Sequence, residues 1–218
     1  MSNGTDLLAE LPVPWRLAFE QAWTSWRAGN FGIGAVLVEP TDMSIVAAGR
    51  NRVAQRTDEP GLLSGNMTAH AEMNAFASLD RFNADGLHIY TTLQPCLMCA
   101  ATAMMLKVAH VHFAAEDEFY DGLDDLWDGH PLTNDRRPAT TGPLLGDSIK
   151  LNQFARLLPL TFTFEQFPGR SAEVLARRRH PKLVALIDEL RRERSIEPLR
   201  QLATLDDALD ALWDRLPG

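Results

Sequence analysis

The sequence contains a short set of residues that can hold a metal ion and move a proton. His70-Ala71-Glu72 is followed, after 22 intervening residues, by Pro95-Cys96-Leu97-Met98-Cys99, which contains the only two cysteines in 218 residues. One imidazole and two thiolates make three protein ligands for Zn²⁺, and a three-ligand site keeps the fourth tetrahedral position for water. His70, Cys96 and Cys99 are therefore predicted to form a catalytic rather than a structural zinc site.

Glu72 is predicted to carry protons rather than to bind the metal ion. It stands two residues from His70, so on a helix the two side chains cannot point in the same direction. A carboxylate above a metal site can take a proton from the attacking water, deliver it to a ring nitrogen of the substrate and later protonate the departing amine. The expected reaction is a hydrolytic deamination that releases ammonia and leaves an oxo-ring.

Two helix starts are expected to position these residues. Thr68 or Asn66 can cap a first helix that carries His70 and Glu72 in its first turn. Pro95 suits the first turn of a second helix, because its missing amide proton would have had no intrahelical partner there. The two cysteines are three residues apart, which places them on one face of that helix. A helix N-terminus also favours thiolate over thiol.

Simpler interpretations of the same residues stay open. A Cys-x-x-Cys pair can be a redox dithiol, and a single histidine near a helix start is usually structural. The joint presence of His-x-Glu, of a proline before the first cysteine and of strand-like runs before both helices favours the catalytic site. A purely structural zinc is disfavoured because no fourth cysteine or histidine stands at zinc-finger spacing.

Length, charge and hydropathy limit the class of protein. With 218 residues the chain can form one domain with a substantial core. It shows no leader-like start and no apolar run approaching about 18 residues, so we expect a cytoplasmic protein with no membrane partner. The net charge is −8, and residues 1–169 hold 11 Lys and Arg against 20 Asp and Glu. Because nucleic-acid binding depends on neutralising phosphates, this acidic chain is not expected to bind nucleic acid.

Hydrophobic periodicity predicts alternating helices and strands. We expect, in chain order, an aromatic-rich helix over 13–28, a hairpin over 31–48, the His70 helix, a strand over 87–92, the cysteine helix to about residue 106, a strand over 108–114, an irregular loop over 129–146, a final strand over 157–167 and two leucine-striped helices. This order indicates a layered α/β sheet, with a catalytic domain over 1–168 and a helical extension over 169–218. The leucine stripes can pack on the core or on a second subunit.

The order of these motifs resembles the cytidine deaminase-like superfamily of zinc-dependent deaminases. The resemblance covers residues 13 to about 128 and rests on residues 31–38, Gly49-Arg50-Asn51, Thr68 to Glu72, Pro95 to Cys99 and the strand around Val111. The motif order is most similar to guanine deaminases and bacterial tRNA adenosine deaminases. The resemblance implies a three-layer α/β/α fold with a central five-stranded mixed sheet, here with extra C-terminal helices, and it implies a Zn²⁺-binding homodimer.

Four further residues are assigned to the substrate site by this resemblance. Asn51 matches the asparagine that hydrogen-bonds the substrate ring, Phe31 is assigned to substrate binding, and the backbone amide of Ala71 is expected near the substrate carbonyl. Asp125 ends Gly122-Leu123-Asp124-Asp125, which is similar to the Gly-Phe-Asp-Asp element of guanine deaminases, where the last aspartate is a proton shuttle and purine contact. Asn51 can also be a plain turn residue, and Asp125 a solvated carboxylate of the acidic run that comprises Glu116, Asp117, Glu118, Asp121, Asp124, Asp125 and Asp128.

The sequence departs from this family where a substrate would be recognised. Gln94 replaces the usual glutamate before Pro-Cys, and Asn66-Met67 replaces Asp-Pro. Residues 56–65 look like an insertion beside the pocket. Met104-Met105-Leu106 lacks the polar, basic character of relatives that act on tRNA.

We therefore expect a zinc hydrolase that deaminates a small amino-substituted ring. A free purine base such as guanine, or a close analogue such as a triazine or pterin, is the leading substrate. The alternatives are tRNA adenosine, cytosine or cytidine, and a catalytically silent zinc-binding protein. Glu72 argues against the silent protein, because a structural site needs no carboxylate over the metal ion.

Overall fold

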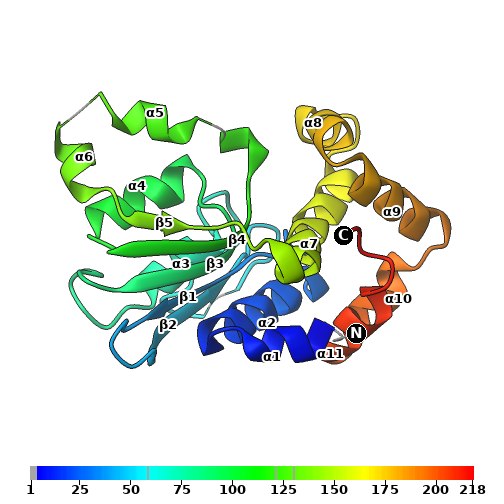
Figure 1. Ribbon diagram of the computed structural model, residues 1–218, viewed down its shortest axis with the longest axis horizontal. Coiled ribbons are helices and arrows are strands. Elements are labelled where there is room, and N and C mark those ends of the chain that lie inside the picture. Colours follow the sequence, from blue (N-terminus) through cyan, green and yellow to red (C-terminus); the bar gives the residue numbers. More distant parts are fainter. Residues whose placement is uncertain (1–3, 58, 121, 130) are drawn as a thin grey trace.

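A five-stranded mixed sheet lies at the centre of the computed structural model, which describes residues 4–57, 59–120, 122–129 and 131–218 (Figure 1). The strand order is β2-β1-β3-β4-β5. β1 is antiparallel to β2 and β3, whereas β3, β4 and β5 run parallel to one another. The expected five-stranded mixed sheet is thereby confirmed. The strands are β1 (Gly34–Val38), β2 (Ile45–Arg50), β3 (His88–Leu93), β4 (His110–Ala115) and β5 (Ala139–Thr141).

Helices cover both faces of this sheet, which gives the expected three layers (Figure 1). On one face, alanines of α3 and α4 pack against Leu37 of β1 and Ile89 of β3. On the other face, aromatic residues of α2 and α7 pack against Val36 and Tyr90. Neighbouring residues of one strand thus face two separate apolar clusters, as the alternation of side chains along a strand requires. These helices are α2 (Val13–Arg27), α3 (Ala71–Ala77), α4 (Leu97–Met105) and α7 (Ile149–Gln166).

Glycine allows α3 to lie directly on the hairpin. A Cβ atom at Gly49 in β2 would stand 2.3 Å from the carbonyl oxygen of Ala71 and 2.3 Å from the backbone nitrogen of Ala75. Both atoms belong to the backbone of α3, so no side-chain rotation could relieve the clash. The missing side chain at Gly49 therefore sets the position of the helix that follows His70.

The final strand predicted over 157–167 is wrong, because this segment belongs to the 18-residue helix α7. Leucines and phenylalanines of α7 are buried between the sheet and the C-terminal helices. A helix buried on most of its sides shows no clear apolar stripe, so its periodicity does not distinguish it from a strand. Pro159 inside the helix weakened the helical signal further. The fifth strand is instead β5, three exposed residues within the expected loop over 129–146.

The predicted helix caps also differ from the structure. Asn66 Oδ1 accepts a hydrogen bond from the backbone N–H of Thr68 at 2.9 Å, so the two form a local turn ahead of the helix. α3 begins at Ala71, and His70 occupies the N-cap position without a side-chain cap hydrogen bond. Cys96 occupies the same position in α4, with Pro95 one residue before it. Both side chains are therefore available to a ligand instead of the helix backbone.

The C-terminal helices pack on the same core as the N-terminal ones. Leucines of α9 and α11 are buried together with Trp15 and Phe19 of α2 in one apolar cluster. The leucine stripes therefore pack within the chain, and the division into domains at residue 169 stays a prediction. No helix among the described residues has the length and apolar character to span a membrane. The remaining helices are α1 (Gly4–Glu10), α5 (Leu123–Trp127), α6 (Pro131–Arg136), α8 (Ser171–Arg179), α9 (Pro181–Arg192), α10 (Ile196–Arg200), α11 (Leu205–Leu212) and the short 3-10 turns η1 (Glu118–Tyr120) and η2 (Gly146–Ser148).

Candidate active site

His70, Cys96 and Cys99 come together at the facing ends of α3 and α4. The Sγ atoms of the two cysteines are 3.6 Å apart, and the Nδ1 atom of His70 lies 3.5 Å from Sγ of Cys96 and 3.6 Å from Sγ of Cys99. A tetrahedral Zn²⁺ with ordinary bond lengths needs about 3.8 Å between two sulfurs and about 3.6 Å between sulfur and nitrogen. The three ligand atoms therefore have a spacing that is compatible with zinc, and their assignment as its ligands stays a prediction.

Glu72 lies beside this ligand set, on the first turn of α3. Its side chain is buried, with Oε2 3.5 Å from Sγ of Cys99. Its Oε1 accepts a hydrogen bond from the hydroxyl of Thr91 in β3 at 3.3 Å. Burial raises the pKa of this carboxyl, while the nearby His70 acts in the opposite direction. A carboxyl with a raised pKa is better matched to gaining and losing a proton near neutral pH.

The two cysteines differ in protonation in the absence of a metal ion. The hydrogen bond to Cys99 lowers the pKa of Cys96 to about 4, against the effect of burial. The same hydrogen bond, together with burial, raises the pKa of Cys99. Binding of zinc deprotonates a coordinating thiol, so loading the site should release the proton of Cys99.

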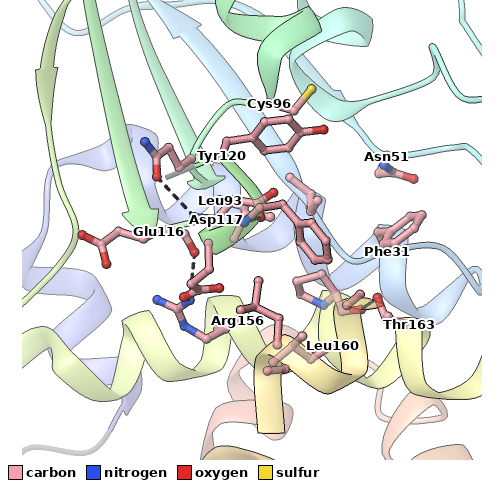
Figure 2. Close-up of a pocket in the computed structure, with 18 of the residues that line it drawn as sticks. Phe31, Asn51, Leu93, Cys96, Glu116, Asp117, Tyr120, Arg156, Leu160 and Thr163 are labelled. Atoms are coloured by element: carbon pink, nitrogen blue, oxygen red, sulfur yellow. Dashed lines mark hydrogen bonds and ion pairs between the residues drawn. The ribbon is translucent and has the colours of Figure 1, made fainter. Parts of the chain in front are cut away.

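A pocket of about 480 Å³ opens over the ligand set. One wall is formed by residues that lie just before β1, just after β2 and at the C-terminal ends of β3 and β4, while residues of α7 and α8 form the other. Asn51 and Phe31 lie on one side of the pocket, and Tyr120 and Cys96 lie near one another across from them (Figure 2). Ligand sites in open α/β sheets lie beyond the carboxyl ends of the strands, which is where this pocket lies.

Two of the four residues assigned to the substrate line this pocket. The buried Asn51 places its Oδ1 3.1 Å from the backbone nitrogen of Val53, and Phe31 packs against Phe162 of α7 with ring centroids 4.4 Å apart. Ala71 is the first residue of α3, and its side chain is buried outside the lining. Its expected contact to a substrate carbonyl stays a prediction.

Asp125 is not brought to the pocket in this structure. It lies on α5 with an exposed side chain, and the pocket lining does not include it. Its assignment as a proton shuttle stays a prediction, and Asp121 of the same acidic run lies outside the described residues. The carboxylate that the structure does bring to the pocket is Asp117, eight positions earlier in the same run.

Asp117 is a site residue that the sequence reasoning missed. Its backbone N–H donates to the Oε1 atom of Gln94 at 3.3 Å, and its Oδ1 atom accepts from the backbone N–H of Phe119 at 3.1 Å. Burial raises the pKa of Asp117 to about 6. The available signal was its position two residues after β4, because ligand sites lie beyond the carboxyl ends of parallel strands. It was missed because it belongs to an acidic run whose members were assigned to a solvated surface.

Arg156 of α7 was also missed, because it stands directly before the segment 157–167 that was assigned to a strand. This buried arginine donates through Nη1 to the carbonyl oxygen of Glu116 at 2.9 Å and forms an ion pair with Glu118. His180, which follows α8, contacts the same carboxylate of Glu118. The contacts of Arg156 join the acidic segment after β4 to α7 (Figure 2), and that of His180 joins it to the end of α8. They hold Glu116 and Glu118 in the pocket wall.

Comparisons with known proteins agree with this geometry. Residues 14–115 match the cytidine and deoxycytidylate deaminase zinc-binding region. The tRNA-specific adenosine deaminase of Aquifex aeolicus is 28% identical over 149 residues, which cover 66% of this chain and 92% of that protein. The corresponding protein of Agrobacterium fabrum is 31% identical over 105 residues, covering 46% of this chain and 62% of that protein.

The fold is shared with a solved guanine deaminase from Nitrosomonas europaea. That structure has a TM-score of 0.50 and 22% sequence identity, and the match covers 69% of this chain and 84% of the other. At this level of identity the likeness concerns the fold alone. The matched region 14–115 contains His70, Cys96, Cys99 and Glu72, and this part of the chain has the zinc-binding region of the cytidine and deoxycytidylate deaminases, a group of zinc-dependent hydrolytic enzymes.

Proposed function

We propose that this chain deaminates a free nucleobase or nucleoside-like ring, with a purine such as guanine or a close triazine or pterin analogue as the preferred substrate. The observation that carries the proposal is the buried Glu72 beside three zinc ligands, at a pocket closed by the chain's own C-terminal half. A ring bound in this pocket would lie next to both Glu72, the proposed proton carrier, and the proposed zinc site.

The chemistry follows from the positions of these side chains. His70, Cys96 and Cys99 would hold zinc, which supplies a Lewis acid that polarises water toward hydroxide. Glu72 takes the proton that the attacking water loses. Thr91 orients this carboxylate through its hydrogen bond to Oε1. Glu72 then donates to a ring nitrogen of the substrate and to the leaving amine, so that one residue moves the protons at both steps.

The walls of the pocket support a small ring as the substrate. Phe31, Leu160 and Phe167 supply apolar contact area, and Phe167 follows directly after α7. Pockets of a few hundred Å³ with apolar walls and few polar groups are typical of small-molecule sites. Glu116 and Asp117 also line the pocket. Their negative charge favours the N–H and amino donors of a purine over the phosphates of a polynucleotide.

Ammonia release from the purified, zinc-loaded protein tests the proposal. The substrate panel is guanine, guanosine, adenine, cytosine, cytidine, ammeline and isocytosine, with Glu72→Gln as the inactive control. We expect the highest kcat/KM with guanine or a guanine-like ring. Release from cytosine or cytidine alone would replace the purine assignment, and no release from any free ring would contradict the proposal.

Deamination of adenosine in tRNA is the second candidate. It is favoured by the sequence relatives named above, which are tRNA-specific adenosine deaminases. An enzyme of this kind neutralises phosphates, so its affinity for tRNA must fall steeply as salt rises. We expect this acidic chain to show weak tRNA binding at physiological salt and no inosine in the product. Tight, salt-dependent binding with inosine formation would establish the second candidate. The expected homodimer stays a prediction that light scattering can test.

A further inference from the structure

Three histidines gather on the sheet well away from the zinc ligands described above. His110 and His112 stand two positions apart on β4, and His88 lies opposite His110 on the neighbouring parallel strand β3. Because alternate residues of a strand face the same side, all three imidazoles project from one face. Their nearest ring nitrogens all lie within 4.8 Å of one another.

We propose that His88, His110 and His112 form a second metal site, which takes a borderline divalent transition ion such as Zn²⁺, Ni²⁺ or Cu²⁺. Imidazole is the ligand that suits these ions. Two histidines at alternate positions of one strand and a third on the next strand can present three nitrogens to one ion, as three-histidine zinc sites require. The remaining coordination positions would be filled by water.

The distances support one shared ion. The Nε2 atom of His112 lies 3.3 Å from the Nδ1 atom of His88. Two nitrogens bound to one tetrahedral Zn²⁺ are also about 3.3 Å apart. The rings of His110 and His112 stack with centroids 4.1 Å apart, so His110 has to rotate about its terminal side-chain torsion to direct a nitrogen at the same ion. This torsion is broad in histidine, and the rotation therefore costs little.

The surroundings leave the three imidazoles available. They are half-buried, and none of the ion pairs among the described residues involves them. Burial lowers the pKa of each, that of His112 to about 4, so the rings are neutral at pH 7 as metal ligands must be. The hydroxyl of Thr141 in β5 lies 2.8 Å from the Nε2 atom of His110. The rotation of His110 that a shared ion requires directs Nδ1 at the ion and moves Nε2, so the Thr141 hydroxyl has to rotate with the ring to keep this outer contact, which is of the kind that orients metal-binding histidines.

The second site is separate from the catalytic one. His88 and His110 begin β3 and β4, whereas Cys96 and Asp117 follow the opposite ends of these strands. At about 3.3 Å per residue, the six-residue strand β4 holds its two ends about 16 Å apart. An ion bound to the three histidines would join β3 to β4 and cannot take part in the chemistry at Glu72.

Metal stoichiometry tests the proposal on the full-length, untagged protein. After removal of metal with a chelator, equilibrium dialysis against Zn²⁺ should load two equivalents in wild type and one in the double variant His110→Gln/His112→Gln. His180→Gln is the matched control, because it removes a histidine elsewhere and should keep two equivalents. The single variant His88→Gln provides a milder test if the double variant does not fold. One equivalent in wild type, or two in the double variant, would overturn the proposal.

Cobalt identifies which site is filled. Co²⁺ in the catalytic site gives a thiolate-to-metal charge-transfer band, whereas Co²⁺ bound by histidines alone gives d–d bands without it. We expect the second equivalent to add only d–d absorption, and Thr141→Val to weaken its binding about tenfold. A charge-transfer band that grows with the second equivalent would show that the cysteines bind both ions and would contradict the proposal.

Discussion

The Oε2 atom of Glu72 lies 3.5 Å from Sγ of Cys99, although 27 positions separate them in the chain. The contact exists because α3 and α4 begin side by side, so that the proposed proton carrier and a proposed zinc ligand come from different helices. Thr91 of β3 holds the other oxygen of the same carboxylate. The chemistry of the site therefore depends on three elements that converge on one point.

Glu72→Gln should keep zinc and lose turnover. The amide can still accept a hydrogen bond from Thr91, but it cannot carry a proton, and a general acid-base group contributes about 10²–10⁴-fold to the rate. Ammonia release and metal content should be measured on the same preparation. Glu116→Gln is the matched control, because it neutralises an exposed carboxylate of the same pocket and should change kcat far less. Wild-type turnover in a zinc-loaded Glu72→Gln protein would falsify the mechanism.

Cys96→Ala or Cys99→Ala should remove the metal ion and destabilise the fold together. A ligand that binds only the folded state adds RT ln(1 + [L]/Kd), about 4 kcal/mol when free zinc is 1,000 times Kd. Denaturant unfolding with and without zinc should therefore show that zinc increases the free energy of unfolding of wild type but not that of the two cysteine variants. Met98→Leu, between the two cysteines, should retain it. Unchanged zinc content in either cysteine variant would show that the ligand assignment is wrong.

Asp117→Asn should lower kcat/KM by about tenfold or more. Asp117 lines the pocket. Removing a carboxylate that accepts hydrogen bonds from the substrate leaves the donors of the substrate unpaired, which lowers kcat/KM strongly. Asp125→Ala is the matched comparison, since both carboxylates come from the segment after β4 and only Asp117 lies in the pocket. Equal small effects would assign both to a solvated acidic surface. A larger loss in Asp125→Ala would confirm the role that the sequence resemblance assigns to that residue.

The raised pKa of Asp117 should also appear in the pH dependence of stability. Its pKa of about 6 in the folded protein lies above its unfolded value of 3.8. Between these two values the folded state binds a proton that the unfolded chain has released, so the contribution of this group to stability falls as the pH rises from about 4 to 6. One pKa unit corresponds to about 1.4 kcal/mol, and because the side chain of Asp117 is only partly buried we expect a total near 1 kcal/mol.

Asp117→Asn removes this titration. Denaturant unfolding at pH 4.5 and pH 7.5 should therefore show the variant gaining about 1 kcal/mol of stability relative to wild type at the higher pH. A difference between variant and wild type that does not change with pH would show that Asp117 titrates normally in the folded protein.

Gly49→Ala should displace α3 and weaken the zinc site. The new Cβ atom would meet the backbone of α3 at Ala71 and Ala75, both at 2.3 Å. Overpacking of this kind costs about 1–3 kcal/mol, and α3 follows directly from His70. Thermal unfolding and zinc affinity should both decline. Gly129→Ala is the control, because nothing lies within 4 Å of its added Cβ. Parallel behaviour of the two variants would contradict the close approach at Gly49.

The sequence by itself predicted that His70, Cys96, Cys99 and Glu72 belong to one site, and the structure brings these four side chains together. These residues lie within a few positions of two helix starts, so their spacing along the chain already constrains their directions. It also indicated α2, the hairpin, β3 and β4, whose apolar patterns are short and clear, but not the short helix α1 before them. Such features are local, and local features are the ones that a single sequence reveals.

Only the tertiary structure decided what surrounds these residues. α7 is a helix because neighbours bury it on most sides, and its pattern alone could not distinguish it from a strand. Asp117 and Arg156 reach the pocket, and the three histidines meet across β3 and β4, through contacts between segments far apart in the chain. Which acidic residue enters a pocket depends on how its segment packs, because solvated and buried carboxylates have the same sequence pattern.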